Sequence, residues 1–222
     1  MTKANTNPWL EHNASASTPL EHALDAAYAA GPSAATIERA QAAVRQTLAT
    51  QAGPPMYYDL VQDTPLGPLW IAVGEQGLLT IEYESSEDSL RAYLHKLGGQ
   101  PLRSSERVAA AAEQVRLYLL GDTQAVELAV DLSHLTPFQQ RVLQETRRVP
   151  RGQVRTYMQI ANSIGNPKAV RAVGQALRHN PIPIVVPCHR VVASDGTLGG
   201  YGGKMRDARK LSLLKLEGVS FA

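Results

Sequence analysis

The sequence of 222 residues predicts an α+β protein in which a small α/β domain with an antiparallel sheet precedes a mostly helical domain. Two observations support this fold class. Strand-like segments cluster within residues 56–134, whereas helical periodicity dominates residues 135–222. The hydrophobic content of 44% and the charged content of 19% are those of an ordinary globular chain, while residues 1–55 form a separate N-terminal extension.

Residues 1–55 are predicted to be a helical extension of unknown function. The segment TPLE at residues 18–21 has the form of a capping box with proline at the first helical position, and an alanine-rich helix follows it. A second helix is expected over residues 34–50, and its apolar side is mostly alanine. Alanine offers little surface to bury, so the packing of these helices stays open. The segment AGPP at residues 52–55 has the composition of a linker.

Residues 56–134 are predicted to form the α/β domain. Three strands are expected over residues 57–61, 69–73 and 78–83, and a turn signal separates the first two. Two helices are expected over residues 89–97 and 107–120. The domain contains no chemical motif, so we expect it to act as a scaffold.

Residues 135–222 are predicted to be mostly helical, with a helix-turn-helix near their centre. One helix opens at residue 136 and ends before Pro150. A short helix over residues 156–165 is closed by glycine, and Asn166 and Pro167 then open a helix over residues 168–178 as N-cap and first-turn proline. In DNA-binding helix-turn-helix motifs the second helix enters a groove, and here it shows Lys168, Arg171 and Arg178 to solvent. Such motifs also occur as plain packing units.

The charges of the two halves of the chain differ in sign. Residues 1–135 carry 8 Lys and Arg against 16 Asp and Glu, a net charge of −8. Residues 136–222 carry 14 against 4, a net charge of +10. The basic half predicts either contact with a polyanion or attraction between the halves, and charge alone favours neither.

Several classes of protein are excluded by composition. No apolar run approaches the roughly 18 to 20 residues that cross a bilayer, and the first residues lack the apolar core of a signal peptide. One cysteine cannot form an intramolecular disulfide or a multi-thiolate metal site. We therefore expect a cytoplasmic protein that has no membrane contact, no metal and no cofactor.

The single cysteine, Cys188, lies in the segment IPIVVPCHRVV at residues 182–192. Only the thiolate is reactive, and a free thiol has a pKa near 8.5, so a nucleophilic cysteine needs a base or a positive environment. His189 is adjacent, and the chain must bend if the two side chains are to meet directly or through a water. Glu217 is a candidate to orient that histidine. Free cysteines usually act as small buried hydrophobes, and the residues alone favour that interpretation.

The segment PCHRVV at residues 187–192 resembles the active-site signature of the O6-alkylguanine-DNA alkyltransferases, or methylated-DNA–protein-cysteine methyltransferases. The resemblance extends over about residues 56–220, through blocks that stand in that family's order: DTPLGPL (63–69), TPFQQRV (136–142), PRGQVRTY (150–157), GNPKAVRAV (165–173), GYGG (200–203) and LLKLEG (213–218). It implies a ribonuclease-H-like N-terminal domain and a C-terminal domain with a winged-helix-like helix-turn-helix.

The resemblance implies direct DNA repair by a stoichiometric and irreversible transfer. Cys188 would accept the alkyl group of O6-alkylguanine, and the restored guanine would leave. His189 would take the thiol proton through a bridging water, and Glu217 would stabilise the resulting imidazolium. Tyr157 would donate to N3 of the flipped base. One thioether forms per molecule, so each protein reacts once.

The resemblance also implies how double-stranded DNA is bound, with the second helix in the minor groove of alkylated DNA. Arg171 would fill the space vacated by the flipped base, and Asn180 would act as a hinge beside the active-site loop. The other implied contacts to substrate or DNA are Val191, Tyr201, Gly202, Lys168, Arg178 and Lys210. Alanines 169, 172 and 176 would permit a close approach to the groove. A monomer would suffice for this reaction.

This chain departs from the family pattern at some positions. The cysteine-containing zinc site of some relatives is expected to be absent, and Gly202 stands where some members have a serine, which predicts a pocket open to larger alkyl groups. The alternative function is that of the alkyltransferase-like proteins, which bind alkylated DNA but lack the cysteine. A transcriptional regulator and a general thiol hydrolase are further alternatives. The sequence does not indicate the preferred alkyl group, activity on O4-methylthymine or the purpose of residues 1–55.

Overall fold

The computed structural model describes residues 19, 22, 26, 31–51, 53–83, 85–122, 126–205 and 207–220. Contacts divide the chain into two units, residues 1–51 and 52–222. Helix α2 (Ala34–Gln51) is the second helix expected from the sequence, and its Ile37 and Val44 are exposed. The capping box expected at residues 18–21 and most of the helix after it lie outside the described residues. Within the described part of the chain, no helix combines the length and the apolar character that crossing a membrane requires.

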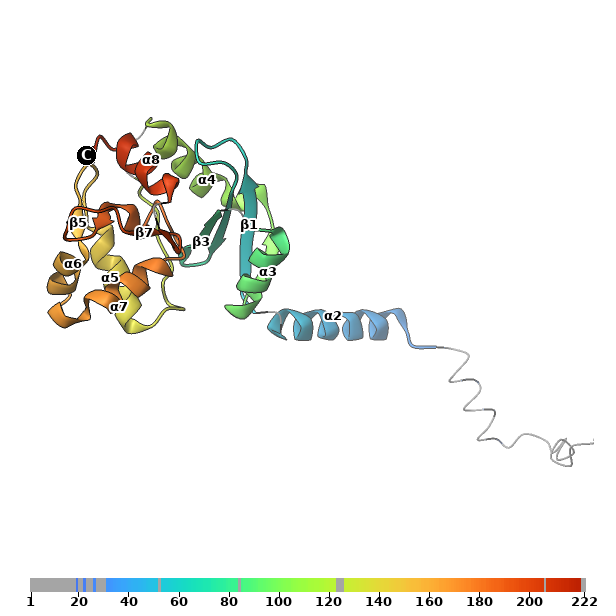
Figure 1. Ribbon diagram of the computed structural model, residues 1–222. Helices are drawn as coiled ribbons and strands as arrows, with labels where there is room; N and C mark the ends of the chain where they lie inside the picture. Colours follow the sequence, from blue (N-terminus) through green and yellow to red (C-terminus); the bar gives the residue numbers. More distant parts are fainter. Residues whose placement is uncertain are drawn as a thin grey trace, which may run out of the picture. The chain divides into compact units, whose positions relative to one another are not determined.

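The N-terminal half of the second unit contains a four-stranded sheet in the order β3-β2-β1-β4 (Figure 1). The three expected strands are confirmed as β1 (Pro55–Val61), β2 (Leu69–Gly74) and β3 (Gly77–Tyr83), and neighbouring strands in this group are antiparallel. A fourth strand, β4 (Gln100–Arg103), pairs in parallel with β1 at the edge of the sheet. Its four residues include a proline and are too few to show alternation, so no strand was predicted there.

Both faces of the sheet are covered by helices. Successive side chains of a strand point to opposite faces, and along β2 Leu69 and Ile71 belong to one hydrophobic cluster while Trp70 and Ala72 belong to another. Helix α4 (Ser105–Leu120) contributes to the first cluster and helix α3 (Glu87–Lys96) to the second. Gly121 closes α4 with a φ of 85°, the left-handed conformation that glycine adopts without a steric penalty.

The C-terminal half consists of short helices and two-residue strands. Thr136 and Gln139 form a reciprocal capping box that begins the first helix. The elements in chain order are α5 (Pro137–Arg147), β5 (Arg155–Thr156), α6 (Tyr157–Ser163), η1 (Pro167–Ala169), α7 (Val170–Arg178), η2 (Cys188–Arg190), β6 (Val191–Val192), β7 (Gly200–Tyr201), β8 (Lys204–Met205) and α8 (Ala208–Leu216).

The expected helix-turn-helix is formed by α6 and α7, but its second helix begins later than predicted. The amide of Ala169 donates to the carbonyl of Asn166, which closes a 3₁₀ turn, and the side chain of Asn166 makes no capping bond. The α-helix therefore starts at Val170 rather than at residue 168. Ala176 is only 3% exposed and packs in the core, so it cannot line a DNA-facing surface as expected.

The two halves share one hydrophobic core. Residues of β2, α4, α5 and α7 belong to a single cluster that crosses the expected boundary near residue 134. Two hydrogen bonds, from the backbone amide of Ile81 and from Thr80 Oγ1, both reach the carbonyl of Pro181 at 2.9 Å. Strand β3 therefore holds the start of the loop that leads to Cys188.

We predict that Ile71→Ala lowers the free energy of unfolding by about 2–5 kcal/mol, because Ile71 is fully buried in the shared core and the truncation leaves a cavity. Urea denaturation followed by circular dichroism measures this change. Val44→Ala, at a side chain that is 58% exposed on α2, is the control and should change stability by less than about 0.5 kcal/mol. Equal stability of the two variants would contradict the shared core.

Candidate active site

Cys188 lies at the end of a buried loop that follows α7. Every residue from Pro181 to Val192 is buried. Asn180 holds this loop from its start, since its side-chain amide donates to the carbonyl of Val186 at 2.8 Å and its Oδ1 accepts from the amide of Ile182 at 3.0 Å. Ile184 has a φ of 74°, a conformation that is rare for a β-branched residue. Such backbone strain is found mainly at functional sites.

The thiol of Cys188 is 7% exposed and receives a hydrogen bond from Asn180 Nδ2 at 3.2 Å. Burial raises the pKa of this thiol, although the bond from Asn180 and the positive charge of Lys210 oppose that effect. The chain bends at Cys188 and His189 through the 3₁₀ turn η2 (Cys188–Arg190), as a meeting of the two side chains would require. Because its pKa is raised, Cys188 is a thiol rather than a thiolate in the resting protein.

His189 is fully buried, and its Nε2 donates to Glu217 Oε1 at 2.6 Å. Its Nδ1 is also buried and has no hydrogen-bond partner among the residues that the structure describes. Burial lowers the pKa of His189 below its ordinary value of 6.5, and the opposing effect of Glu217 is smaller. The imidazole is thus neutral at pH 7, with its proton on Nε2 and a basic lone pair on Nδ1.

The carboxylate of Glu217 is shared by three side chains. Arg190 donates to it twice, from Nε to Oε2 at 2.9 Å and from Nη2 to Oε1 at 3.0 Å, and the hydroxyl of Tyr118 donates to Oε1. Burial alone would raise the pKa of Glu217, but the hydrogen bonds from His189 and Arg190 outweigh it and hold the pKa well below its ordinary value. Glu217 therefore stays ionised beside the neutral histidine.

Sequence reasoning assigned no role to Arg190 or Tyr118. Arg190 stands inside the PCHR segment, and its place directly after the candidate base His189 was the available signal. Tyr118 lies on α4, in the half of the chain expected to be a scaffold, and 99 residues separate it from Glu217. Nothing in its local sequence distinguishes it from an ordinary core tyrosine.

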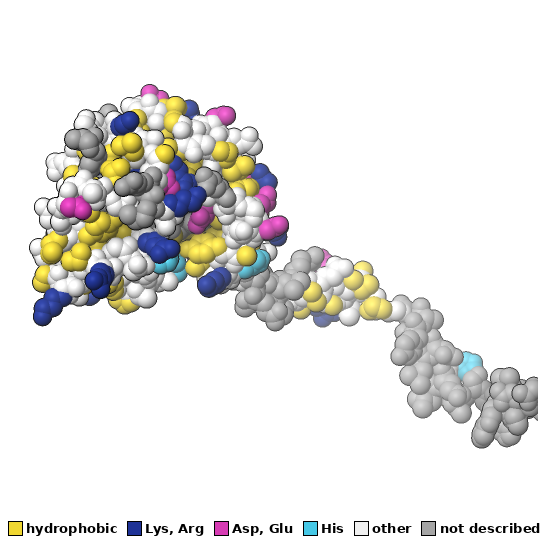
Figure 2. All heavy atoms as spheres, viewed as in Figure 1, with side chains coloured by type: hydrophobic (Ala, Val, Ile, Leu, Met, Phe, Trp, Pro, Cys, Tyr) yellow, Lys and Arg dark blue, Asp and Glu magenta, His cyan; other side chains and the backbone are white. Residues whose placement is uncertain are grey.

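Cys188 borders two hollows in the surface. A pocket of about 290 Å³ lies between α7 and the β7–β8 hairpin, and a cleft of about 730 Å³ lies between the two halves. Figure 2 shows Lys and Arg side chains gathered over the part of this face where α7 lies. The pocket is lined by Tyr157, Gly174, Gln175, Leu177, Arg178, Cys188, Gly200, Tyr201, Gly203 and Lys204.

Tyr157 is the first residue of α6 and forms one wall of the 290 Å³ pocket. Burial raises the pKa of its hydroxyl, which stays protonated and can donate a hydrogen bond. Gly199 packs against it, and a Cβ at that position would lie 2.8 Å from the Tyr157 hydroxyl. Because Gly199 also has a φ of 65°, only glycine fits there without displacing Tyr157.

Lys210, one of the residues that the resemblance implied to contact substrate or DNA, is a buried lysine. Its side chain is buried, and its ammonium group donates to the carbonyl of Val191 at 2.6 Å and to that of Gly200 at 3.3 Å. Burial lowers its pKa to about 8. The ammonium group of Lys210 thus joins β6 to β7.

Other residues expected to contact substrate or DNA lie either on the exposed surface of η1 and α7 or at the borders of the two hollows. Lys168, Arg171 and Arg178 are exposed on η1 and α7, as predicted, and Arg178 also borders both hollows. Tyr201 is buried in the wall of the pocket, whereas Gly202 is exposed in the larger cleft with a φ of 53°. Among the described residues, no group of three His, Cys, Asp or Glu side chains could hold a metal ion.

Comparison with known proteins identifies two matching domains. Residues 56–132 match the ribonuclease-like domain of 6-O-methylguanine DNA methyltransferase, and residues 137–219 match its DNA binding domain. The chain is 38% identical over 166 residues to a constitutive methylated-DNA–protein-cysteine methyltransferase of Bacillus subtilis, covering 75% of this chain and 98% of that protein. It is 40% identical over 159 residues to a methylated-DNA–protein-cysteine methyltransferase of Salmonella typhimurium, covering 70% and 92%.

Solved structures of methyltransferases also align with this chain. The O6-methylguanine methyltransferase of Mycobacterium tuberculosis aligns with a TM-score of 0.60 at 36% identity, covering 73% of this chain and 92% of that one. The Mycobacterium tuberculosis OGT in complex with DNA aligns with a TM-score of 0.59 at 36% identity, covering 72% and 92%. The fold, the arrangement around Cys188 and these matches show that the chain belongs to the methylated-DNA–protein-cysteine methyltransferase family.

Proposed function

We propose that this protein repairs DNA directly by moving the alkyl group of O6-alkylguanine to Cys188. The observation that carries the proposal is the buried His189, which follows Cys188 in the sequence, is anchored by Glu217 through Nε2 and has no described hydrogen-bond partner at Nδ1. The sulfur attacks the alkyl carbon, an S–C bond forms, and the bond between that carbon and O6 breaks. The electron pair of the broken bond remains with guanine.

The proton of the thiol is transferred to His189 Nδ1 through a bridging water. Transfer starts from a neutral thiol and a neutral imidazole, which is the charge state that burial favours for both groups. The imidazolium formed in this step is stabilised by the ionised Glu217, whose own burial is compensated by Arg190. The proton finally neutralises the departing guanine.

The target base leaves the duplex and enters the 290 Å³ pocket, because its alkyl carbon cannot be reached within the stack. Tyr157 donates to N3 of the base, and the carbonyl of Val191 accepts from its exocyclic amine. That carbonyl already accepts from Lys210, and a second lone pair is left for the base. Tyr201 and Gly202 border O6 and the alkyl group, and Asn180 fixes the sulfur.

The exposed face of α7 approaches the minor groove of double-stranded DNA. Lys168 and Arg178 neutralise phosphates, and Arg171 fills the space that the flipped base leaves. Since one chain contains every group of the site, the protein acts as a monomer. The thioether product has no good leaving group, so each molecule reacts once. A binding protein without transfer is not favoured, because the acceptor cysteine and its histidine are both present.

We predict that the wild-type protein gains about 14 Da when mixed with DNA containing O6-methylguanine, the mass of one methyl group replacing one hydrogen. Intact-mass spectrometry measures this gain, and peptide mapping locates it at Cys188. Cys188→Ala should gain no mass and should still bind DNA, because the side chain is buried and small. Multiple turnovers, or transfer by Cys188→Ala, would contradict the proposal.

We predict that Arg171→Ala lowers the rate of transfer from duplex DNA by about tenfold or more, a change of about 1.4 kcal/mol in the barrier. Its rate with free O6-benzylguanine should stay unchanged, because no base has to be flipped. Arg107→Ala, at an exposed arginine on α4, is the control and should behave as wild type. Equal loss on both substrates would show that Arg171 has no part in flipping. Rapid-quench kinetics measures both rates.

A further inference from the structure

The hydroxyls of Tyr83 and Tyr201 form a hydrogen bond between the four-stranded sheet and the wall of the cysteine pocket. Tyr83 ends β3, and Tyr201 belongs to β7 in the wall of the cysteine pocket. Their hydroxyl oxygens are 2.8 Å apart, and their rings pack edge to face with centroids 6.2 Å apart. Burial raises the pKa of both groups, so both stay protonated and one hydroxyl donates to the other.

Tyr201 depends on this contact because it is buried. It is 3% exposed, and within the described part of the chain its hydroxyl is bonded to that of Tyr83. A buried hydroxyl that loses its partner keeps its full desolvation cost, so its side chain is driven to move. The ring of Tyr201 also meets the ring of His189 edge on, with centroids 6.4 Å apart. A shift of Tyr201 therefore disturbs both the pocket wall and the general base.

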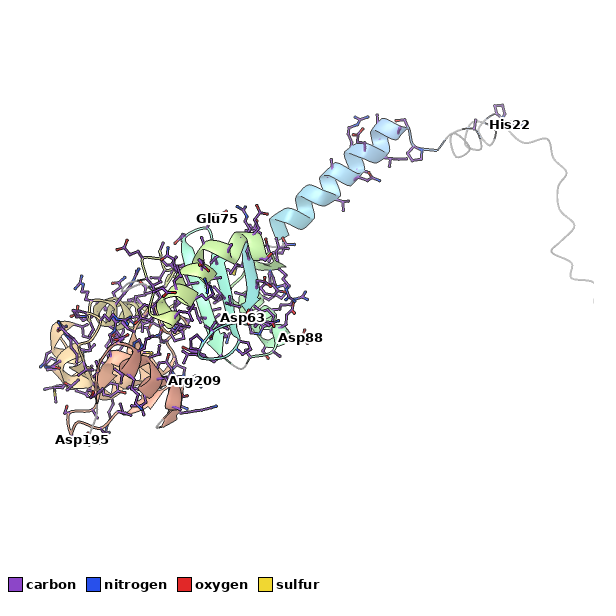
Figure 3. All side chains as sticks on the ribbon, turned by 90° about the horizontal axis from the view of Figure 1, so that it is seen from above. His22, Asp63, Glu75, Asp88, Asp195 and Arg209 are labelled. Atoms are coloured by element: carbon purple, nitrogen blue, oxygen red, sulfur yellow. The ribbon has the colours of Figure 1, made fainter. Side chains whose placement is uncertain are left out.

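A second contact, with Arg209, fixes the ring of Tyr83. The guanidinium of Arg209, labelled in Figure 3, lies 4.5 Å from the centre of the Tyr83 ring, a cation–π contact. Arg209 also pairs with Asp207 at 2.7 Å, and Asp207 caps the start of α8. Helix α8 leads to Glu217 at its C-cap. The tyrosine pair thus connects β3, β7 and α8 beside the reacting groups.

We infer that Tyr83 is a positioning residue for alkyl transfer, which fixes the hydroxyl of Tyr201 and thereby the wall of the pocket beside Cys188. The inference rests on the proposed function and deepens it, because it gives a second residue of the ribonuclease-like half, besides Tyr118, a part in the reaction. Tyr83 contacts neither base nor alkyl group in this account. It acts through Tyr201, and its removal changes the rate of transfer rather than the affinity for DNA.

The test compares Tyr83→Phe, Tyr201→Phe and the double variant in the full-length protein. Single-turnover transfer from duplex DNA with O6-methylguanine gives the maximum rate at saturating protein, and binding of unmodified duplex gives the affinity. Tyr83→Phe should lower the maximum rate by about tenfold, which corresponds to 1.36 kcal/mol, with unchanged affinity. The double variant should be no slower than Tyr201→Phe, because Tyr83 acts only through that hydroxyl.

Tyr58→Phe is the matched control, since it removes a hydroxyl bonded to Glu87 from a tyrosine that packs on the opposite face of the sheet. It should transfer at the wild-type rate. A wild-type rate for Tyr83→Phe, or rate losses that multiply in the double variant, would overturn the inference while leaving the proposed function intact. Absence of any transfer by the wild-type protein would instead refute the proposed function.

Discussion

The buried carboxylate of Glu217 is the constraint on which the active site depends. It receives hydrogen bonds from His189, Arg190 and Tyr118, and these residues come from η2 and α4 while Glu217 caps the end of α8. Burying one charge without a partner would cost several kcal/mol, and the bidentate bond to Arg190 offsets that cost. The hydrogen bond from Tyr118 on α4 to this carboxylate joins the N-terminal half of the chain to the ion pair of Arg190 and Glu217, which belongs to the C-terminal half.

Glu217 is neutralised by one residue, Arg190, and is available to stabilise the protonated form of another, His189. Arg190 neutralises Glu217 in the resting protein, so His189 does not need to be charged and remains available as a base. In the proposed transfer, a proton that reaches Nδ1 is stabilised by the same carboxylate, which already lies 2.6 Å from Nε2. Lys210 adds a second buried positive charge near the sulfur, where it favours the thiolate as that form develops. Burial keeps both the thiol of Cys188 and the imidazole of His189 neutral in the resting protein.

Local patterns in the sequence predicted the parts of the fold that local chemistry decides. The helix that opens at residue 136, the helix expected over residues 107–120 and the three strands β1 to β3 all follow from neighbouring residues. Long-range contacts were not predicted: Tyr118 lies 99 residues from Glu217, and Tyr83 lies 118 residues from Tyr201. The burial of Lys210 was not predicted either, because a lysine that is buried against backbone carbonyls has no signature in the sequence.

The charge state of His189 tests this account most directly. A ¹⁵N-histidine NMR titration of the full-length protein, with the signal assigned by its loss in His189→Gln, reports which ring nitrogens carry protons. The account predicts a neutral ring at pH 7 with its proton on Nε2 and a pKa below the ordinary 6.5. A ring protonated on both nitrogens at pH 7 would mean that Glu217 charges the histidine at rest, and the mechanism described here would be contradicted.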